Sequence, residues 1–267
     1  MTRFLSLSSG SNGNCYYLGN EQVSVLIDVG IGVRTIKKRL AEHDIDIADI
    51  SFVLVSHDHV DHIKSLGNFS ERYRKPVYVS STLAAALNRH FCTRGHMTGC
   101  MRKMEPEVAI QPAQGVEVTS FRVPHDATET VGFHIDFFGE KFTFMTDIGE
   151  VTDTAVHYAS LADHLIVESN YDIDMLLGGP YTHALKMRIV QGNGHMSNDQ
   201  TSSLLRRSYH SGLKDICLCH LSENNNTPTL AFDCARRALG EIGVSVGKDV
   251  SLTCLPRREA SEVIEIR

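Results

Sequence analysis

The chain has 267 residues, which fits one large domain or two small ones and is ample for a buried core. Hydrophobic residues make up 42% and charged residues 22%, as in ordinary globular proteins, and no stretch approaches the roughly 20 apolar residues of a membrane span. The net charge of −6 argues against a uniformly basic nucleic-acid-binding domain, although bound metal ions would add positive charge locally.

The first third of the chain is expected to consist mainly of short strands. Apolar or alternating runs bounded by Gly, Asn and Ser predict strands at residues 4–7, 15–18, 23–28, 51–56 and 77–80. A glycine-rich loop is expected at residues 9–14. Apolar side chains at helical spacing predict a helix at residues 33–40, and a second helix is expected at 82–89.

Strands and helices continue to mix in the rest of the chain. Strands are predicted at residues 116–123, 131–138, 141–145, 164–167, 215–219 and 251–255, and helices at 199–210 and 229–240. Residues 92–104 and 172–192 show no clear pattern and stay unassigned. The mixture predicts a single α/β domain over residues 1–267, an αββα sandwich with helices outside two packed sheets.

Side chains that can bind metals or transfer protons follow the predicted strands. They are Asp28, His57, His125, Asp147, Glu168 and His220. Loops that leave the carboxyl edge of a parallel or mixed sheet can converge on one place. We therefore expect these side chains to form one site.

The run from His57 to His62 is the strongest chemical signal in the sequence. Its six residues are His-Asp-His-Val-Asp-His, and a tight loop after a strand can turn His57, His59, Asp61 and His62 toward one point. Imidazole nitrogen and carboxylate oxygen suit zinc, and manganese or iron would accept the same ligands. The run predicts a metal site.

A pair of metal ions needs further ligands, and His125, Asp147 and His220 are the candidates. A carboxylate such as Asp147 can bridge two ions, which lie roughly 3.5–4 Å apart in two-metal sites. Taken singly, each residue has an ordinary interpretation: Asp147 as a helix cap, for example, or His125 as a polar loop residue.

The ordered motifs resemble those of the metallo-β-lactamase superfamily from Ser8 to about Pro228. The resemblance implies the four-layer sandwich of that superfamily and two divalent ions, zinc or manganese. It implies that His57, His59 and His125 hold one ion and that Asp61, His62 and His220 hold the other. Asp147 would bridge the ions together with a hydroxide, and Asp28 would orient the ligands without binding metal. Asp58, the variable residue of the run, is expected to point elsewhere.

Two further segments resemble those of the tRNA-processing and β-CASP nucleases. The segments are Val167–Asn170 and Gly194–Asn198. The resemblance implies that Glu168 hydrogen-bonds His195, and that His195 contacts the scissile phosphate or protonates the leaving oxygen. The helix that starts near Ser197 and Asn198 would offer backbone N–H groups to a phosphate.

Longer strings are similar to the WalJ/YycJ (VicX) group within that superfamily. These strings are residues 7–15, 55–63 and 220–228. The resemblance implies a DNA-directed 5′-to-3′ exonuclease, with His195, Glu168 and Asp61 in catalysis and single-stranded DNA as the expected substrate. Asn12, Ser197 and Asn198 are the expected substrate contacts, and Arg94, Arg102, Lys103, Lys186 and Arg188 either follow a phosphate backbone or form a solvated face.

Three other functions stay open at this point. A small-molecule phosphodiesterase acting on a cyclic or ribosyl phosphate would use the same site, and the acidic net charge favours it. A lactam, lactone or thioester hydrolase is disfavoured by Glu168 and His195, and an inert metal-binding scaffold by the complete ligand set.

Seven cysteines without framework spacing and no apolar signal-peptide core lead us to expect a cytoplasmic protein. A homodimer contact through one of the unassigned stretches stays open.

Overall fold

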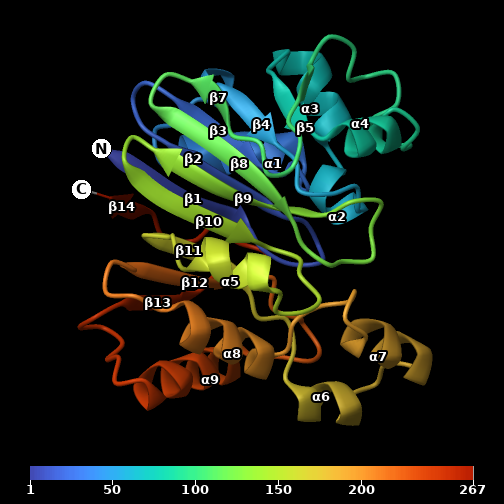
Figure 1. Ribbon diagram of the computed structural model, residues 1–267. Coiled ribbons are helices and arrows are strands. Elements are labelled where there is room, and N and C mark those ends of the chain that lie inside the picture. Colours follow the sequence, from blue (N-terminus) through green and yellow to red (C-terminus); the bar gives the residue numbers. More distant parts are fainter. Residues whose placement is uncertain (267) are drawn as a thin grey trace. The chain divides into compact units, whose positions relative to one another are not determined.

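The strands form two sheets of seven strands each in the computed structural model, which describes residues 1–266 (Figure 1). The chain divides into two compact units, each built on one sheet. The first unit comprises residues 1–108, 127–129 and 256–266, and the second comprises residues 109–126 and 130–255. A single domain over residues 1–267 stays a prediction. No helix within residues 1–266 has the length and apolar character that crossing a membrane requires.

The sheet of the first unit has the strand order β14-β1-β2-β3-β4-β5-β6. Its strands are β1 (Thr2–Ser8), β2 (Cys15–Gly19), β3 (Ser24–Ile27), β4 (Phe52–Leu54), β5 (Val77–Val79), β6 (Met101–Lys103) and β14 (Ile264–Ile266). Neighbours from β14 to β3 are antiparallel, and neighbours from β3 to β6 are parallel. The carboxyl ends of β3, β4 and β5 therefore share one edge, where their loops can converge.

One apolar cluster joins the helices of the first unit to its sheet. The helices are α1 (Val33–Ala41), α2 (Val60–Ile63), α3 (Leu66–Tyr73) and α4 (Ser81–Leu87), with a 3₁₀ turn at Ile47–Asp49. Ile36 and Leu40 of α1 are buried in the same cluster as Phe69 of α3 and Val53 of β4. Burying each such side chain stabilises the fold by about 1.5–3 kcal/mol, which holds the loops at the sheet edge in place.

The sheet of the second unit has the order β13-β12-β11-β10-β9-β8-β7. Its strands are β7 (Ile110–Ala113), β8 (Val116–Arg122), β9 (Val131–Phe137), β10 (Glu140–Met145), β11 (His164–Glu168), β12 (Asp215–Cys219) and β13 (Ser251–Cys254). Neighbours from β7 to β10 are antiparallel, and those from β10 to β13 are parallel. Here too, the carboxyl ends of the parallel strands, β10 to β13, share one edge of the sheet.

Two groups of helices belong to the second unit. The helices are α5 (Asp153–Ala159), α6 (Ile173–Gly178), α7 (His183–Val190), α8 (Asn198–Ser208) and α9 (Pro228–Glu241). α8 and α9 lie side by side (Figure 1), and Leu204 and Ala235 from them share a buried cluster with Leu165 of β11. α6 and α7 have a small cluster of their own, which contains Leu176 and Ile189.

The predicted helices at 33–40, 82–89 and 229–240 are confirmed as α1, α4 and α9. The helix predicted at 199–210 begins at Asn198 and ends at Ser208. Ser197 is the cap, because its side chain accepts a hydrogen bond from Gln200 N while the Gln200 side chain accepts from Ser197 N. The stretch 92–104 contains β6, and the stretch 172–192 contains α6 and α7.

Candidate metal centre

The loop after β4 brings the predicted ligands of the His57–His62 run together within the first unit. His57 and His62 are fully buried, and their ring centroids are 4.0 Å apart, while the rings of His57 and His59 are 4.7 Å apart. α2 begins directly after His59, and its first turn places Asp61 Oδ2 3.6 Å from His62 Nε2. The four predicted ligands of the first unit are therefore brought together.

Asp58 has a different role from the other polar residues of the run. Its carboxylate accepts hydrogen bonds from Thr128 N at 3.2 Å and from Thr128 Oγ1 at 2.5 Å. The carboxylate therefore secures the segment 127–129, in agreement with the expectation that Asp58 points away from the ligands.

Asp28, directly after β3, holds the loop after β4 through hydrogen bonds to Ser56 and His62. Its Oδ1 accepts from Ser56 N at 2.8 Å, and its Oδ2 accepts from Ser56 Oγ at 2.7 Å and from His62 Nδ1 at 2.6 Å. Asp28 is fully buried and has a φ of 61°, a left-handed conformation that Asp tolerates better than most residues. The expected role of Asp28 as an orienting residue fits these contacts.

We predict that Asp28→Asn lowers the metal affinity of the chain by about 10–100-fold. Asparagine also tolerates the left-handed conformation, so the backbone is kept while the carboxylate that fixes the His62 ring is lost. Equilibrium dialysis against manganese measures the affinity, and circular dichroism checks the fold. Wild-type affinity in a folded variant would contradict the orienting role.

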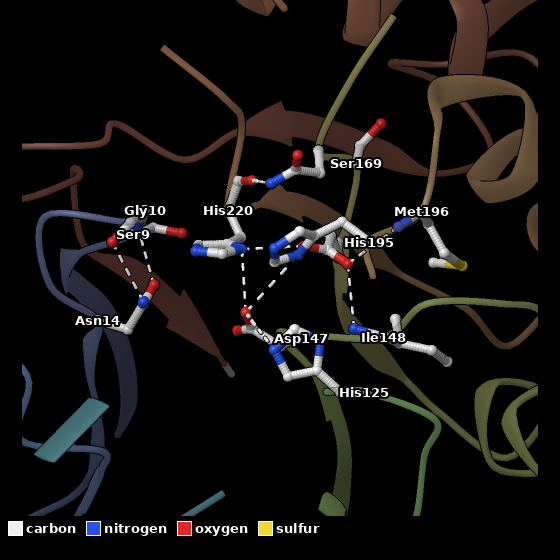
Figure 2. Close-up of polar contacts among 12 residues, drawn as sticks. Ser9, Gly10, Asn14, His125, Asp147, Ile148, Ser169, His195, Met196 and His220 are labelled. Carbon is white, nitrogen blue, oxygen red and sulfur yellow. Dashed lines mark hydrogen bonds and ion pairs between the residues drawn. The ribbon is translucent and has the colours of Figure 1, made fainter. Parts of the chain in front are cut away.

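Asn14 is a contact that the sequence analysis missed. Its side chain is fully buried, and its Nδ2 lies 3.2 Å from Asp61 Oδ2 and 2.9 Å from His62 Nε2. Its Oδ1 accepts from Gly10 N at 2.9 Å, which fixes the amide within the glycine-rich loop (Figure 2). Asn12, the residue expected to contact substrate, is exposed at the tip of the same loop, and its role stays a prediction.

Gly30 allows the loop of residues 9–14 to approach the metal-binding run. A Cβ built on Gly30 would lie 1.7 Å from the backbone oxygen of Asp61, and that oxygen accepts from Asn14 N at 2.7 Å. Only glycine fits, because neither of the neighbouring groups is a side chain that can rotate away.

We predict that Gly30→Ala destabilises the protein by at least about 1–3 kcal/mol, the usual cost of forcing extra atoms into a packed interior. It should also weaken metal binding, because Asp61 must shift. Urea unfolding measures the free energy of unfolding, with Gly240→Ala as the control, since a Cβ on Gly240 in α9 meets no atom within 4 Å. Equal stability of the two variants would contradict the close approach.

In the second unit, His125, Asp147 and His220 gather at the ends of β8, β10 and β12 (Figure 2). Asp147 Oδ1 lies 3.7 Å from His125 Nε2 and 3.3 Å from His220 Nδ1, and all three side chains are almost fully buried. His220 has a φ of 52°, a strained conformation that is common at functional sites. The three predicted ligands of this unit are therefore brought together.

Glu168 is the central acceptor of this half of the site. Its Oε1 accepts from His195 Nδ1 at 2.7 Å and from His220 Nδ1 at 2.9 Å, and its Oε2 accepts from Ile148 N at 3.0 Å and Met196 N at 3.2 Å. Figure 2 shows His195 and His220 on the same side of Asp147. The hydrogen bond between Glu168 and His195 that the sequence predicts is present.

Glu168 and His195 shift each other's pKa in opposite directions. Burial alone would raise the pKa of Glu168, but the charge and hydrogen bond of His195 and the hydrogen bond from His220 hold it below its usual value. Burial would lower the pKa of His195, but the charge and hydrogen bond of Glu168 raise it above its usual value. His195 is also the accessible histidine of this group, with 23% of its side chain exposed against 1% for His125 and 2% for His220.

The histidines are oriented as metal ligands require. The Nδ1 atoms of His62 and His220 face the buried carboxylates of Asp28 and Glu168, and the Nδ1 of His125 faces a backbone carbonyl at 2.7 Å. A neutral ring that donates its Nδ1 proton presents the lone pair of Nε2, and such partners are usual behind metal-bound histidines. Burial lowers the pKa of His125, which favours this neutral form. The residues present therefore fit divalent metal ions.

Ser197 and Asn198, which the sequence analysis placed at the substrate, have internal roles. Ser197 caps α8 and is 8% exposed, and Asn198 is 3% exposed. Asn198 exchanges amide hydrogen bonds with Asn226 at 3.0 and 2.8 Å and accepts from Ser169 Oγ at 2.7 Å. These contacts hold the start of α8 beside the loop after β12, and the expected contact of the two residues with substrate stays a prediction.

Comparison with known proteins gives a consistent result for sequence and fold. Residues 24–214 match the model of the Beta-lactamase superfamily domain. The chain is 31% identical to the exodeoxyribonuclease YycJ of Bacillus anthracis over 245 residues, covering 92% of each chain. It is 28% identical to the exodeoxyribonuclease WalJ of Streptococcus pneumoniae, covering 99% of this chain and 98% of that protein.

The crystal structure of the metallo-beta-lactamase fold protein YhfI from Bacillus subtilis has the same fold. Its TM-score is 0.70 at 15% identity, and the match covers 98% of this chain and 100% of that protein. The predicted fold class, the metallo-β-lactamase-like sandwich, is thereby confirmed. Taken together, the ligand motifs, the two sheets and these similarities show that the chain belongs to the β-lactamase superfamily, in the family that includes YycJ and WalJ.

Proposed function

We propose that this protein is an exonuclease that degrades DNA from the 5′ end, using two divalent ions. Membership of the superfamily makes it a metal-dependent hydrolase, and the relatives YycJ and WalJ are named exodeoxyribonucleases. The observation that carries the choice of a phosphate substrate is the Glu168–His195 pair: an accessible imidazole whose Nδ1 is fixed at 2.7 Å by a buried carboxylate.

Seven side chains are the metal ligands in this proposal. His57, His59 and His125 would hold one ion, Asp61, His62 and His220 the other, and Asp147 would bridge them. This assignment follows the order of the motifs in the family, and the orientation of the buried histidines supports it. Two bound ions supply an activated water near neutral pH and neutralise charge on the phosphate oxygens. Zinc and manganese both suit these ligands.

His195 supplies the proton in this proposal. Glu168 accepts the proton on Nδ1, and when the ring is doubly protonated the opposite nitrogen, Nε2, carries the second proton, which can be given to the departing oxygen. Asp61 has 24% of its side chain exposed, and we propose that it holds the attacking water by a hydrogen bond in addition to binding metal. Glu168 touches no substrate atom in this scheme, because its four hydrogen bonds go to protein groups.

End-labelled single-stranded DNA tests the proposal. With manganese, a 5′ label should be released first as mono- or short oligonucleotides, while a 3′ label stays on shortening strands until late. Bis-p-nitrophenyl phosphate is the matched small substrate. Rapid turnover of that ester without any DNA degradation would favour the small-molecule phosphodiesterase instead, and early release of the 3′ label would reverse the proposed polarity. A cytoplasmic location and a homodimer also stay predictions.

A further inference from the structure

A pocket of about 370 Å³ in the first unit lies between the start of α1 and one side of α3. It is lined by Gly32, Val33, Arg34, Lys37, Ser65, Asn68, Arg72 and Tyr73. None of these residues is a metal ligand or a member of the Glu168–His195 pair. We call this feature the α1–α3 pocket.

The charge of the α1–α3 pocket is entirely positive. Arg34, Lys37 and Arg72 line it, and no Asp or Glu does. Within residues 1–266, none of these three cations forms an ion pair, whereas the next residue of α1, Lys38, pairs with Glu42 at 3.8 Å. Three unpaired cations in one hollow of a chain with net charge −6 favour an anionic ligand.

Neutral donors add to the three cations. α1 has nine residues, and Gly32 at its start provides no side-chain cap, so the N–H groups of Val33 and Arg34 have no capping side chain, whereas Thr35 N donates to Gly32 O at 2.8 Å. The side chain of Ser65 is buried, with 7% of the residue exposed, and its hydroxyl has no hydrogen-bond partner in the described part of the chain. An anion in the pocket would accept a hydrogen bond from this hydroxyl.

The backbone connects this pocket to the metal-binding run. Ser65 N donates to Val29 O at 3.0 Å, and Val29 N donates to His62 O at 2.8 Å. Ser65 follows His62 by three residues, and Gly32 follows Asp28 by four. An anion bound in the pocket would therefore contact the same two loops that carry Asp28 and the predicted metal-binding side chains of the first unit.

We propose that the α1–α3 pocket binds a backbone phosphate of the DNA strand whose end is cleaved. Three cations with N–H and O–H donors match the several oxygens of a phosphate, and the Tyr73 ring, 5.4 Å from the Arg72 guanidinium, helps to hold that guanidinium at the pocket. The inference rests on the proposed function, because it takes DNA as the substrate.

Binding of a fluorescent single-stranded oligonucleotide to the metal-stripped protein tests this proposal without catalysis. Arg34→Gln, Lys37→Gln and Arg72→Gln should each weaken binding about fivefold at 0.1 M salt and reduce the slope of log K against log[salt] by about 0.7. Lys38→Gln is the matched control and should bind as the wild type does. Ser65→Ala should weaken binding without changing the salt slope, since it removes no charge.

The two proposals fail in different ways. Equal DNA binding by the pocket variants and Lys38→Gln, with DNA cleavage by the wild type, would overturn the pocket and leave the nuclease intact. Turnover of bis-p-nitrophenyl phosphate by a wild type that neither binds nor cleaves DNA would overturn the nuclease. Inorganic phosphate should compete only weakly with DNA. If it binds the pocket more tightly than the oligonucleotide does, the pocket is a site for free anions and the proposal is wrong.

Discussion

His195→Ala should reduce DNA cleavage by about 10²–10⁴-fold while the protein keeps its metal ions. The side chain is held by Glu168 and is not among the proposed metal ligands, so its loss removes the proton donor but no ligand. Metal content by atomic emission and the rate of DNA degradation are measured on the same preparation. A low rate with full metal content indicates a catalytic histidine, whereas loss of both indicates a structural or metal-binding one.

His157→Ala is the matched control for that variant. His157 is an exposed histidine on α5 of the same unit and should be replaceable without effect on the rate. Normal cleavage by His195→Ala would refute the phosphate role of His195. A variant that lost its metal together with its activity would show instead that His195 belongs to the metal-binding set.

Asp147→Asn should remove both metal binding and activity. Asp147 lies within 3.8 Å of ring nitrogens of His125, His195 and His220, and it is the proposed bridge between the ions. Loss of its charge removes several kcal/mol of electrostatic stabilisation, so we expect the rate to fall by at least about a thousandfold. The metal-to-protein ratio after dialysis should fall below that of the wild type.

Asp153→Asn provides the comparison for this second variant. Asp153 lies in the first turn of α5, its side chain is fully exposed, and it forms a surface ion pair with Arg207. Surface pairs contribute little, so this variant should keep its metal and its rate. Full metal content in Asp147→Asn would rule out the bridging role, whatever its effect on the rate.

The positions of the candidate residues could be predicted because they follow strands. Asp28, Asp147 and His220 come after β3, β10 and β12, and the alternating or apolar runs before them mark those strands in the sequence. The hydrogen bond from His195 to Glu168 was predictable for a different reason, namely the similarity of two short segments to known nucleases. Periodicity alone says nothing about two residues that are 27 positions apart.

The features that the sequence did not predict depend on contacts between segments that are far apart in the chain. Asn12 and Asn14 are alike in the sequence, but only Asn14 is turned inward to Asp61 and His62, because Gly30 allows the loop to pack against the run. α2 has only four residues, which is too short to show a helical period. The α1–α3 pocket likewise joins residues from two segments whose proximity is set by the packing of the first unit.

Stepwise addition of manganese to the metal-stripped protein, with DNA degradation as the readout, tests the central claim most directly. The stripped protein should be inactive, and the rate should rise with added metal and level off near two ions per chain. Degradation of DNA by the stripped protein, or no degradation after full loading, would contradict the claim that these His and Asp side chains form a two-metal nuclease centre.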